Sequence, residues 1–134
     1  MTLIACLDNN DGMSFNNRRQ SQDKNVIKKI IEISQKHRLV MSPYSAILFS
    51  DCTENIFADE NFLENIKNDD FCFIEKHSPS HFTEITNKII IFRWNRNYPY
   101  DKTFDIDLKS WTFESSEEFV GTSHNKITME VWTK

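Results

Sequence analysis

Three short apolar runs limit the possible folds of this chain more than any other feature. They cover residues 3–7, 71–74 and 88–94, of which 71–74 is continuously apolar and 88–94 also contains Lys88 and Arg93, and each is shorter than a typical helix. A continuous apolar run of this length is typical of a strand that is buried on both faces, as in a parallel sheet. We therefore expect a mostly parallel sheet at the centre of the protein.

Helical signals lie between these runs. Ser21 is expected to cap a helix with Asp23 in its first turn, and apolar residues follow at helical spacing: Val26, Ile27, Ile30, Ile31 and Ile33. Ser42-Pro43 and Ser78-Pro79 each combine an N-cap residue with a proline that suits the first helical position. They predict helices that end near residues 49 and 86.

The remaining segments predict shorter elements. Residues 39–41 and 55–57 are expected to be short strands, with a short helix over 62–66 and extended segments at 103–108, 111–115 and 126–132. The fold class expected is α/β, with a mostly parallel central sheet, antiparallel C-terminal strands and flanking helices. With 134 residues and 39% hydrophobic content, the chain fits one domain over residues 1–134.

Net charge, cysteine spacing and the absence of long apolar runs argue against several classes of function. The net charge of −4 argues against a protein that coats nucleic acid through bulk electrostatics. The cysteines at 6, 52 and 72 form no C-x-x-C pair, and we interpret all three as packing residues. The sequence shows no signal-peptide pattern and no apolar run of about 20 residues. We expect a cytoplasmic protein without a membrane partner, and its oligomeric state is not predicted.

Three stretches resemble the dihydrofolate reductase superfamily. Residues 3–17 are similar to the family's first strand and the mobile loop after it. The helix near Asp23 with the strand at 39–41, and the tail from residue 88 to 132, follow in the family's order. The resemblance covers about two thirds of the chain. It implies the family's fold, with a ligand cleft beside Asp23.

Departures from the family pattern fall on its cofactor. The family has a basic Gly-Arg-Lys-Thr type turn where this chain has Ser42-Pro43-Tyr44-Ser45, and a Gly-Gly pair where this chain has Glu75-Lys76. The segment 49–57 is also short for the family's extra strand and loop. The resemblance therefore implies that orthodox NADPH binding is lost, and no cofactor is expected.

Asp23 is the candidate catalytic residue, because the resemblance places it near the family's substrate-binding carboxylate. A carboxylate at this position can accept two hydrogen bonds from a ligand. The alternative is that Asp23 only complements the helix dipole. Both interpretations stay open at the level of sequence.

The expected ligand is a small anionic or heterocyclic molecule. Paired arginines in the loop after the first strand suit an anion, and the alternative is that they lie in a solvated surface loop. The resemblance and the strand-end rule for α/β sheets together place these expected ligand-binding residues around the cleft: Asp8, Asn17, Arg18, Arg19, Tyr44 and Arg93.

Two alternatives are a surviving NADPH-dependent reductase and an RNA- or nucleotide-binding module. The RNA alternative would use Arg18 with Arg19, and Arg93 with Arg96, next to aromatic residues. His77 and His81 have the spacing of metal ligands, but Pro79 separates them and no second ligand pair follows. No metal site is expected.

Overall fold

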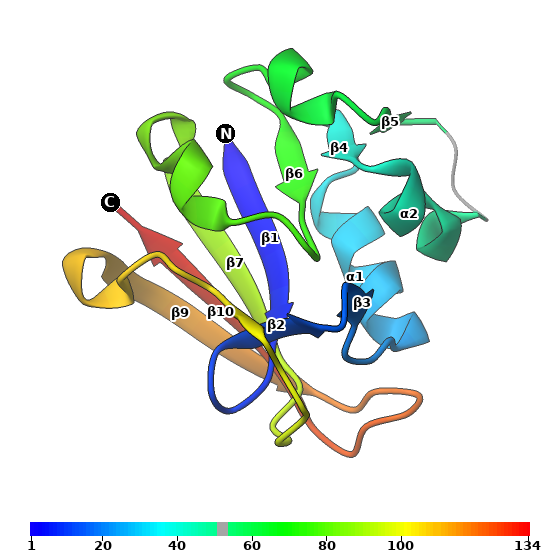
Figure 1. Cartoon of the computed structure of the whole chain (residues 1–134), viewed down its shortest axis with the longest axis vertical. Helices are drawn as coiled ribbons and strands as arrows, with labels where there is room; N and C mark the ends of the chain where they lie inside the picture. Colours follow the sequence, from blue (N-terminus) through cyan, green and yellow to red (C-terminus); the bar gives the residue numbers. More distant parts are fainter. Residues whose placement is uncertain (51–53) are drawn as a thin grey trace.

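A seven-stranded sheet forms the centre of the molecule in the computed structural model, which describes residues 1–50 and 54–134 (Figure 1). The strand order is β5-β4-β6-β1-β7-β10-β9. The bounds, in chain order, are β1 Thr2–Leu7, β4 Leu39–Met41, β5 Ile56–Ala58, β6 Phe71–Phe73, β7 Lys88–Arg93, β9 Thr112–Phe119 and β10 Ile127–Thr133.

The register confirms the predicted parallel centre. β1 lies between β6 and β7 and runs parallel to both, with Ile4 opposite Ile90 and Ala5 opposite Ile91. β4 runs parallel to β5 and β6. β10 is antiparallel to β7, and β9 is antiparallel to β10, which is the C-terminal pair expected from the sequence.

Two apolar layers cover the two faces of the sheet. On one face, α1 (Lys24–Ile33) packs Val26 and Ile30 into a core with Ile4 and Phe92. Opposite α1, the second face is covered by 3-10 helices at Phe62–Asn65 and Pro79–Ile85, by another at Leu108–Ser110, and by the segment that leads into it. Burial on both faces explains why the central strands β1, β6 and β7 are largely apolar, whereas β9 at the edge of the sheet is polar and exposed.

The first helix begins differently from the prediction. Its N-cap is Asp23 and not Ser21, because Asp23 has an extended backbone (φ −153°, ψ 128°) and its side chain accepts from the amide of Asn25. The Ser42 cap is confirmed, since its side chain accepts from the amide of Ser45. It opens α2 (Pro43–Ala46), which a 3-10 helix over Ile47–Phe49 continues.

Two other expectations need correction. The helix predicted after Ser78 is a 3-10 helix, and the Ser78 side chain makes no capping hydrogen bond. The segment 103–108 is not extended throughout, because only β8 (Lys102–Thr103) is a strand and the 3-10 helix at Leu108–Ser110 follows.

A second sheet was not predicted. β2 (Gly12–Phe15), β3 (Arg18–Arg19) and β8 form a three-stranded sheet in the order β3-β2-β8. Asn16 and Asn17 join β2 to β3 with φ values of 51° and 60°, as a two-residue type I′ hairpin requires. In Figure 1, β2 and β3 lie just beyond the carboxyl end of β1. This hairpin covers the carboxyl ends of the parallel strands, which is where ligands bind in open α/β folds.

The cysteines and histidines show no metal arrangement in the described part of the chain. Cys72 is buried, and burial raises its pKa to about 12. Burial also raises the pKa of the Cys6 thiol, and Glu75 adds to this effect. Cys52 lies outside the described residues. Among the described residues, no helix is both long enough and apolar enough to cross a membrane.

Candidate functional site

The candidate site lies at the carboxyl edge of the parallel strands. Because β1, β4, β6 and β7 run in one direction, the residues that follow them meet at this edge. Asp8 follows β1, Tyr44 lies in α2 after β4, Glu75 follows β6, and Arg93 ends β7. The β2–β3 hairpin crosses the same edge and adds Arg19 (Figure 1).

Asp8 is fully buried and holds three loops together. Its Oδ1 accepts from the amides of Asn10 and Gly12, both at 2.8 Å. Its Oδ2 accepts from Nε2 of Gln20 at 3.0 Å and from the amide of Tyr98 at 3.3 Å. With four donors on two oxygens, the acceptor capacity of Asp8 is used within the protein.

Arg93 is neutralised by two carboxylates. Its guanidinium forms ion pairs with Asp11 and, at 3.3 Å, with Glu130. Burial alone would lower the pKa of Arg93, but the two partners raise it above its ordinary value. The side chain therefore links the C-terminal end of β7 to β10, and its positive charge is balanced by carboxylates within the protein.

Arg19 and Glu75 form the most complete ion pair at this edge. Nε of Arg19 lies 2.7 Å from Oε2 of Glu75, and Nη2 lies 3.0 Å from Oε1. Ser45 Oγ donates to the same Oε1 at 2.7 Å. The guanidinium also stacks over the Tyr44 ring at 4.3 Å, and the Tyr44 hydroxyl accepts from the amide of Arg19 at 3.0 Å. The polar groups of these side chains, which come from α2, from β3 and from the segment after β6, are thus paired with one another.

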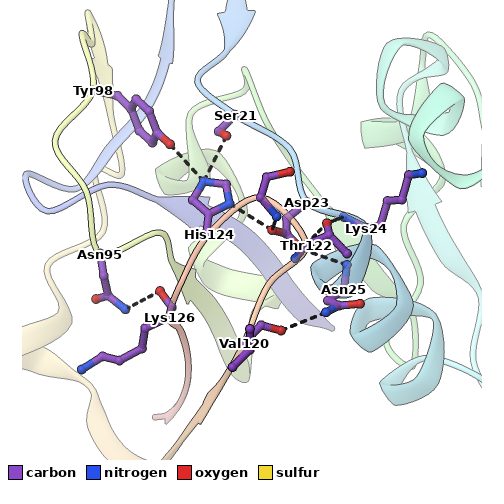
Figure 2. Close-up of polar contacts among 11 residues, drawn as sticks. Ser21, Asp23, Lys24, Asn25, Asn95, Tyr98, Val120, Thr122, His124 and Lys126 are labelled. Carbon is purple, nitrogen blue, oxygen red and sulfur yellow. Dashed lines mark hydrogen bonds and ion pairs between the residues drawn. The ribbon is translucent and has the colours of Figure 1, made fainter.

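Asp23 is buried at the start of α1 and binds the loop between β9 and β10 (Figure 2). Its Oδ1 accepts from the amides of Asn25 and Thr122, both at 2.9 Å, and from the Thr122 hydroxyl. Its Oδ2 accepts from the amide of Ser123 at 2.8 Å and from Nδ1 of His124 at 3.0 Å. These contacts join α1 to a loop about a hundred residues away in the sequence.

The pKa of Asp23 reflects these donors. Burial would raise it, but the hydrogen bonds from Thr122, Ser123, His124 and Asn25 together hold it well below the usual range for an aspartate. The carboxylate is therefore ionised at neutral pH and serves as an acceptor. The contacts favour the helix-end role among the two that the sequence left open, and the ligand-binding role remains a prediction.

His124 extends this network toward the solvent. Its Nε2 lies 3.1 Å from the Ser21 hydroxyl and 2.9 Å from the Tyr98 hydroxyl (Figure 2). The imidazole stacks on Trp94, with the ring centroids 4.5 Å apart and an interplanar angle of 22°. His124 was not among the site residues predicted from the sequence, because its partners come from distant segments.

An open cavity of about 560 Å³ lies between the β2–β3 hairpin and the loop after β7. Its lining combines cationic, polar and aromatic groups: Phe15, Asn16, Arg18, Arg19, Gln20, Tyr98 and Pro99. Within the described residues, the Arg18 side chain has no hydrogen bond or ion pair. A smaller space of about 10 Å³ lies deeper, beside Ser21, Gln20 and Glu75.

Not all the predicted residues meet in one cleft. Arg18 and Arg19 line the open cavity, whereas Asn17 is exposed at the hairpin turn beside it. Tyr44 contacts Arg19 but does not line the cavity. Asp23 and Arg93 are hydrogen-bonded elsewhere, as described above. Asp8 does not line the cavity but accepts hydrogen bonds from the cavity residues Gln20 and Tyr98. The predicted ligand-binding residues did not include Phe15, Gln20 and Tyr98, which also line the cavity.

Comparison with known proteins gives a fold but no sequence family. No protein-family model matches the chain, and no curated protein matches it. Among solved structures, the chain is similar to dihydrofolate reductase from Enterococcus faecalis complexed with NADP(H) and RAB-propyl. The TM-score is 0.67, and the alignment covers 98% of this chain and 94% of that one. The chain has a dihydrofolate reductase-like fold. At 13% identity, this likeness to a dihydrofolate reductase is one of fold alone.

Proposed function

We propose that this protein binds a small anionic heterocyclic ligand in the open cavity between the β2–β3 hairpin and the loop after β7. The observation that carries this proposal is Arg18, an exposed cation in the cavity lining whose side chain has no hydrogen bond or ion pair to any described residue. An arginine of this kind suits a carboxylate or phosphate, which it can contact through two parallel hydrogen bonds.

Aromatic groups in the same cavity support a planar ligand. Phe15 is 41% exposed, and Tyr98 and Pro99 also line the cavity. Ligand sites commonly combine apolar walls with a few polar groups that fix orientation. A ring packed against Phe15 or Tyr98, with its anionic group on Arg18, would use both kinds of group.

The proposal excludes orthodox use of NADPH, and the ion pair between Arg19 and Glu75 supports this. The resemblance implies that a cofactor would need basic residues at the start of α2 and an open backbone after β6. In this chain Tyr44 and Ser45, which carry no positive charge, lie at the start of α2. Glu75 follows β6, and its carboxylate is paired with Arg19 and accepts from Ser45. A glutamate at this point would also repel a pyrophosphate.

A reductase that keeps NADPH with altered contacts is the second candidate. The observation in its favour is that the similar solved structure is complexed with NADP(H). The RNA-binding alternative has less support, because Arg19 and Arg93 are both in ion pairs. This leaves Arg18 and Arg96 as the unpaired members of the two arginine clusters, as far as the described residues show.

The test uses folic acid and adenosine 5′-monophosphate as heterocyclic anions, titrated by calorimetry against the full chain. Arg18→Gln should weaken binding of the better probe about tenfold or more, since a charged hydrogen bond contributes about 1.5–3 kcal/mol. Arg96→Gln removes the same charge outside the cavity lining and serves as the matched control. Equal loss in both variants, or no binding of either probe, would contradict the proposal.

A further inference from the structure

Three side chains beside the proposed cavity form an array that the proposed binding function does not use. Asp23, His124 and Ser21 are joined in that order, with 3.0 Å from Asp23 Oδ2 to His124 Nδ1 and 3.1 Å from His124 Nε2 to Ser21 Oγ. Figure 2 shows the imidazole between the other two groups. Asp23 and His124 have almost fully buried side chains, whereas Ser21 is only half-buried.

The hydrogen-bond partners determine the tautomer of His124. Asp23 is ionised and can only accept, so Nδ1 of His124 carries the proton in this contact. In the neutral imidazole, Nε2 then has its lone pair free and accepts a hydrogen bond from a hydroxyl group. Ser21 presents its hydroxyl to this nitrogen. The stack on Trp94 further fixes the orientation of the ring.

We propose that Ser21, His124 and Asp23 form a hydrolytic triad that cleaves esters of small carboxylic acids. Ser21 is the nucleophile, His124 the general base and Asp23 the residue that orients the imidazole, the three roles that recur on unrelated folds. The array has a nucleophile, a base within hydrogen-bond distance of it, and an acid that holds the base. This activity is independent of the binding function proposed above.

The reaction balances without any redox partner. Ser21 Oγ bonds to the ester carbonyl carbon while its proton moves to Nε2 of His124. The bond from the carbonyl carbon to the ester oxygen then breaks, and His124 returns the proton to the leaving alcohol. Water attacks the acyl-serine, giving a proton to Nε2, and the released Ser21 Oγ takes that proton back. The products are the carboxylic acid and the alcohol.

Substrate reaches Ser21 from the open cavity. The small space beside Ser21 is only about 10 Å³, but Arg19 and Gln20 line both this space and the 560 Å³ cavity. The backbone amides of Ser21 and Gln22 donate to no other described residue. They are next to the nucleophile and available for the oxyanion, as the amide after the nucleophile is in many acyl-transfer enzymes.

Tyr98 competes with Ser21 for the same nitrogen. Its hydroxyl lies 2.9 Å from Nε2 of His124, slightly closer than that of Ser21. A neutral imidazole has one acceptor site at Nε2, so one hydroxyl donates at a time. Removing the Tyr98 hydroxyl should leave Ser21 as the donor and increase its reactivity. If the hydrogen bonds among Ser21, His124 and Asp23 were only structural, the Tyr98 variant would show no such increase.

The experiment measures labelling of the full chain with a fluorescent fluorophosphonate, with the labelled residue identified by peptide mass spectrometry. The probe forms a bond from phosphorus to Ser21 Oγ and releases fluoride. We expect labelling at Ser21, abolished by Ser21→Ala and slowed about a hundredfold by His124→Gln, since a positioned general base contributes about 10²–10⁴-fold. Hydrolysis of p-nitrophenyl acetate should fall in the same variants.

Controls separate the activity from folding. Ser116→Ala changes an exposed serine on β9 and should leave labelling unchanged. Circular dichroism confirms that each variant is folded, and Tyr98→Phe should label faster than the wild type. If wild-type Ser21 is not labelled faster than Ser116, or if folded Tyr98→Phe labels no faster at Ser21 than the wild type does, the proposed triad is wrong.

Discussion

Gly121 lies directly against the buried carboxylate of Asp23. A methyl group at Gly121 would stand 2.9 Å from Cγ of Asp23 and 2.8 Å from Cδ1 of Ile127. The amide of Gly121 also donates to the carbonyl of His124 at 2.9 Å, which closes the loop around the carboxylate. The absence of a side chain at Gly121 therefore allows the loop between β9 and β10 to reach α1.

Gly121→Ala should destabilise the protein by about 1–3 kcal/mol, the range for overpacking a well-packed region. The added methyl group must displace either the carboxylate, which five donors hold, or the side chain of Ile127. Urea unfolding measures the change in free energy. Val120→Ala is the neighbouring control, because Val120 is 70% exposed and its loss should cost little. Equal stabilities of the two variants would show that the loop adjusts freely.

Asp23→Asn should lower stability at pH 7 by about 2–3 kcal/mol, since it replaces charge-assisted hydrogen bonds with neutral ones. The pKa of Asp23 is lowered on folding, so its contribution is complete above its unfolded pKa of about 4 and is lost as the pH falls toward the folded value. The stability difference between wild type and Asp23→Asn should therefore shrink between about pH 5 and pH 2.

The same variant separates the two roles of Asp23. If Asp23 only binds the loop, Asp23→Asn lowers the free energy of unfolding and leaves the affinity for the folic acid or adenosine monophosphate probe unchanged. A variant of normal stability that no longer binds the probe would instead support the ligand-binding role that the resemblance implies. Thermal unfolding and calorimetry on the same samples distinguish the two results.

The ion pair between Arg19 and Glu75 should be strongly coupled. In a double-mutant cycle with Arg19→Met and Glu75→Gln, we expect a coupling energy of about 1–3 kcal/mol, because the pair is bidentate and Glu75 is only 9% exposed. The pair of Lys126 and Glu118 is the control. Both of its side chains are more than half exposed, so its coupling should stay below about 0.5 kcal/mol. If the two cycles gave similar coupling energies, the pair of Arg19 and Glu75 would be no stronger than an exposed surface ion pair, and the prediction would be wrong.

The sequence predicts the central sheet because burial on both faces leaves a local signal. The apolar runs at 71–74 and 88–94 match β6 and β7 to within one residue. The β2–β3 hairpin carried a local signal too, since Asn16-Asn17 between Phe15 and Arg18 suits a two-residue turn. It was missed because strands this short have little apolar alternation.

The site was harder to predict because its contacts join distant segments. The partner of Asp23 is His124, and the partner of Arg19 is Glu75, 56 residues away. In the sequence, each of these residues resembles an ordinary charged or polar surface residue. Only the folded structure shows that Asp23 and Arg19 already have partners within the protein. A list of charged residues at strand ends therefore predicts where the site lies, but not which of its members remain free.

The last prediction concerns NADPH, for which we expect no useful affinity and no measurable reduction of dihydrofolate. The resemblance implies two basic contacts at the start of α2 that Tyr44 and Ser45 do not supply, and two such charged contacts contribute about 1.5–3 kcal/mol each. Their loss alone corresponds to roughly a hundredfold or more in affinity. Glu75 adds repulsion for the pyrophosphate and is fixed in place by Arg19 and Ser45.

Fluorescence titration of NADPH and a dihydrofolate reduction assay test this expectation. Glu75→Gly removes the carboxylate, restores a small residue after β6 and frees the Arg19 cation. It should therefore raise NADPH affinity above that of the wild type, whereas Glu118→Gly, an exposed change of the same charge, should not. Micromolar affinity in the wild type, with turnover that Asp23→Asn abolishes, would instead establish the reductase that we rank second. The deciding comparison is between wild type and Glu75→Gly, because only a cofactor blocked by this carboxylate gains affinity when it is removed.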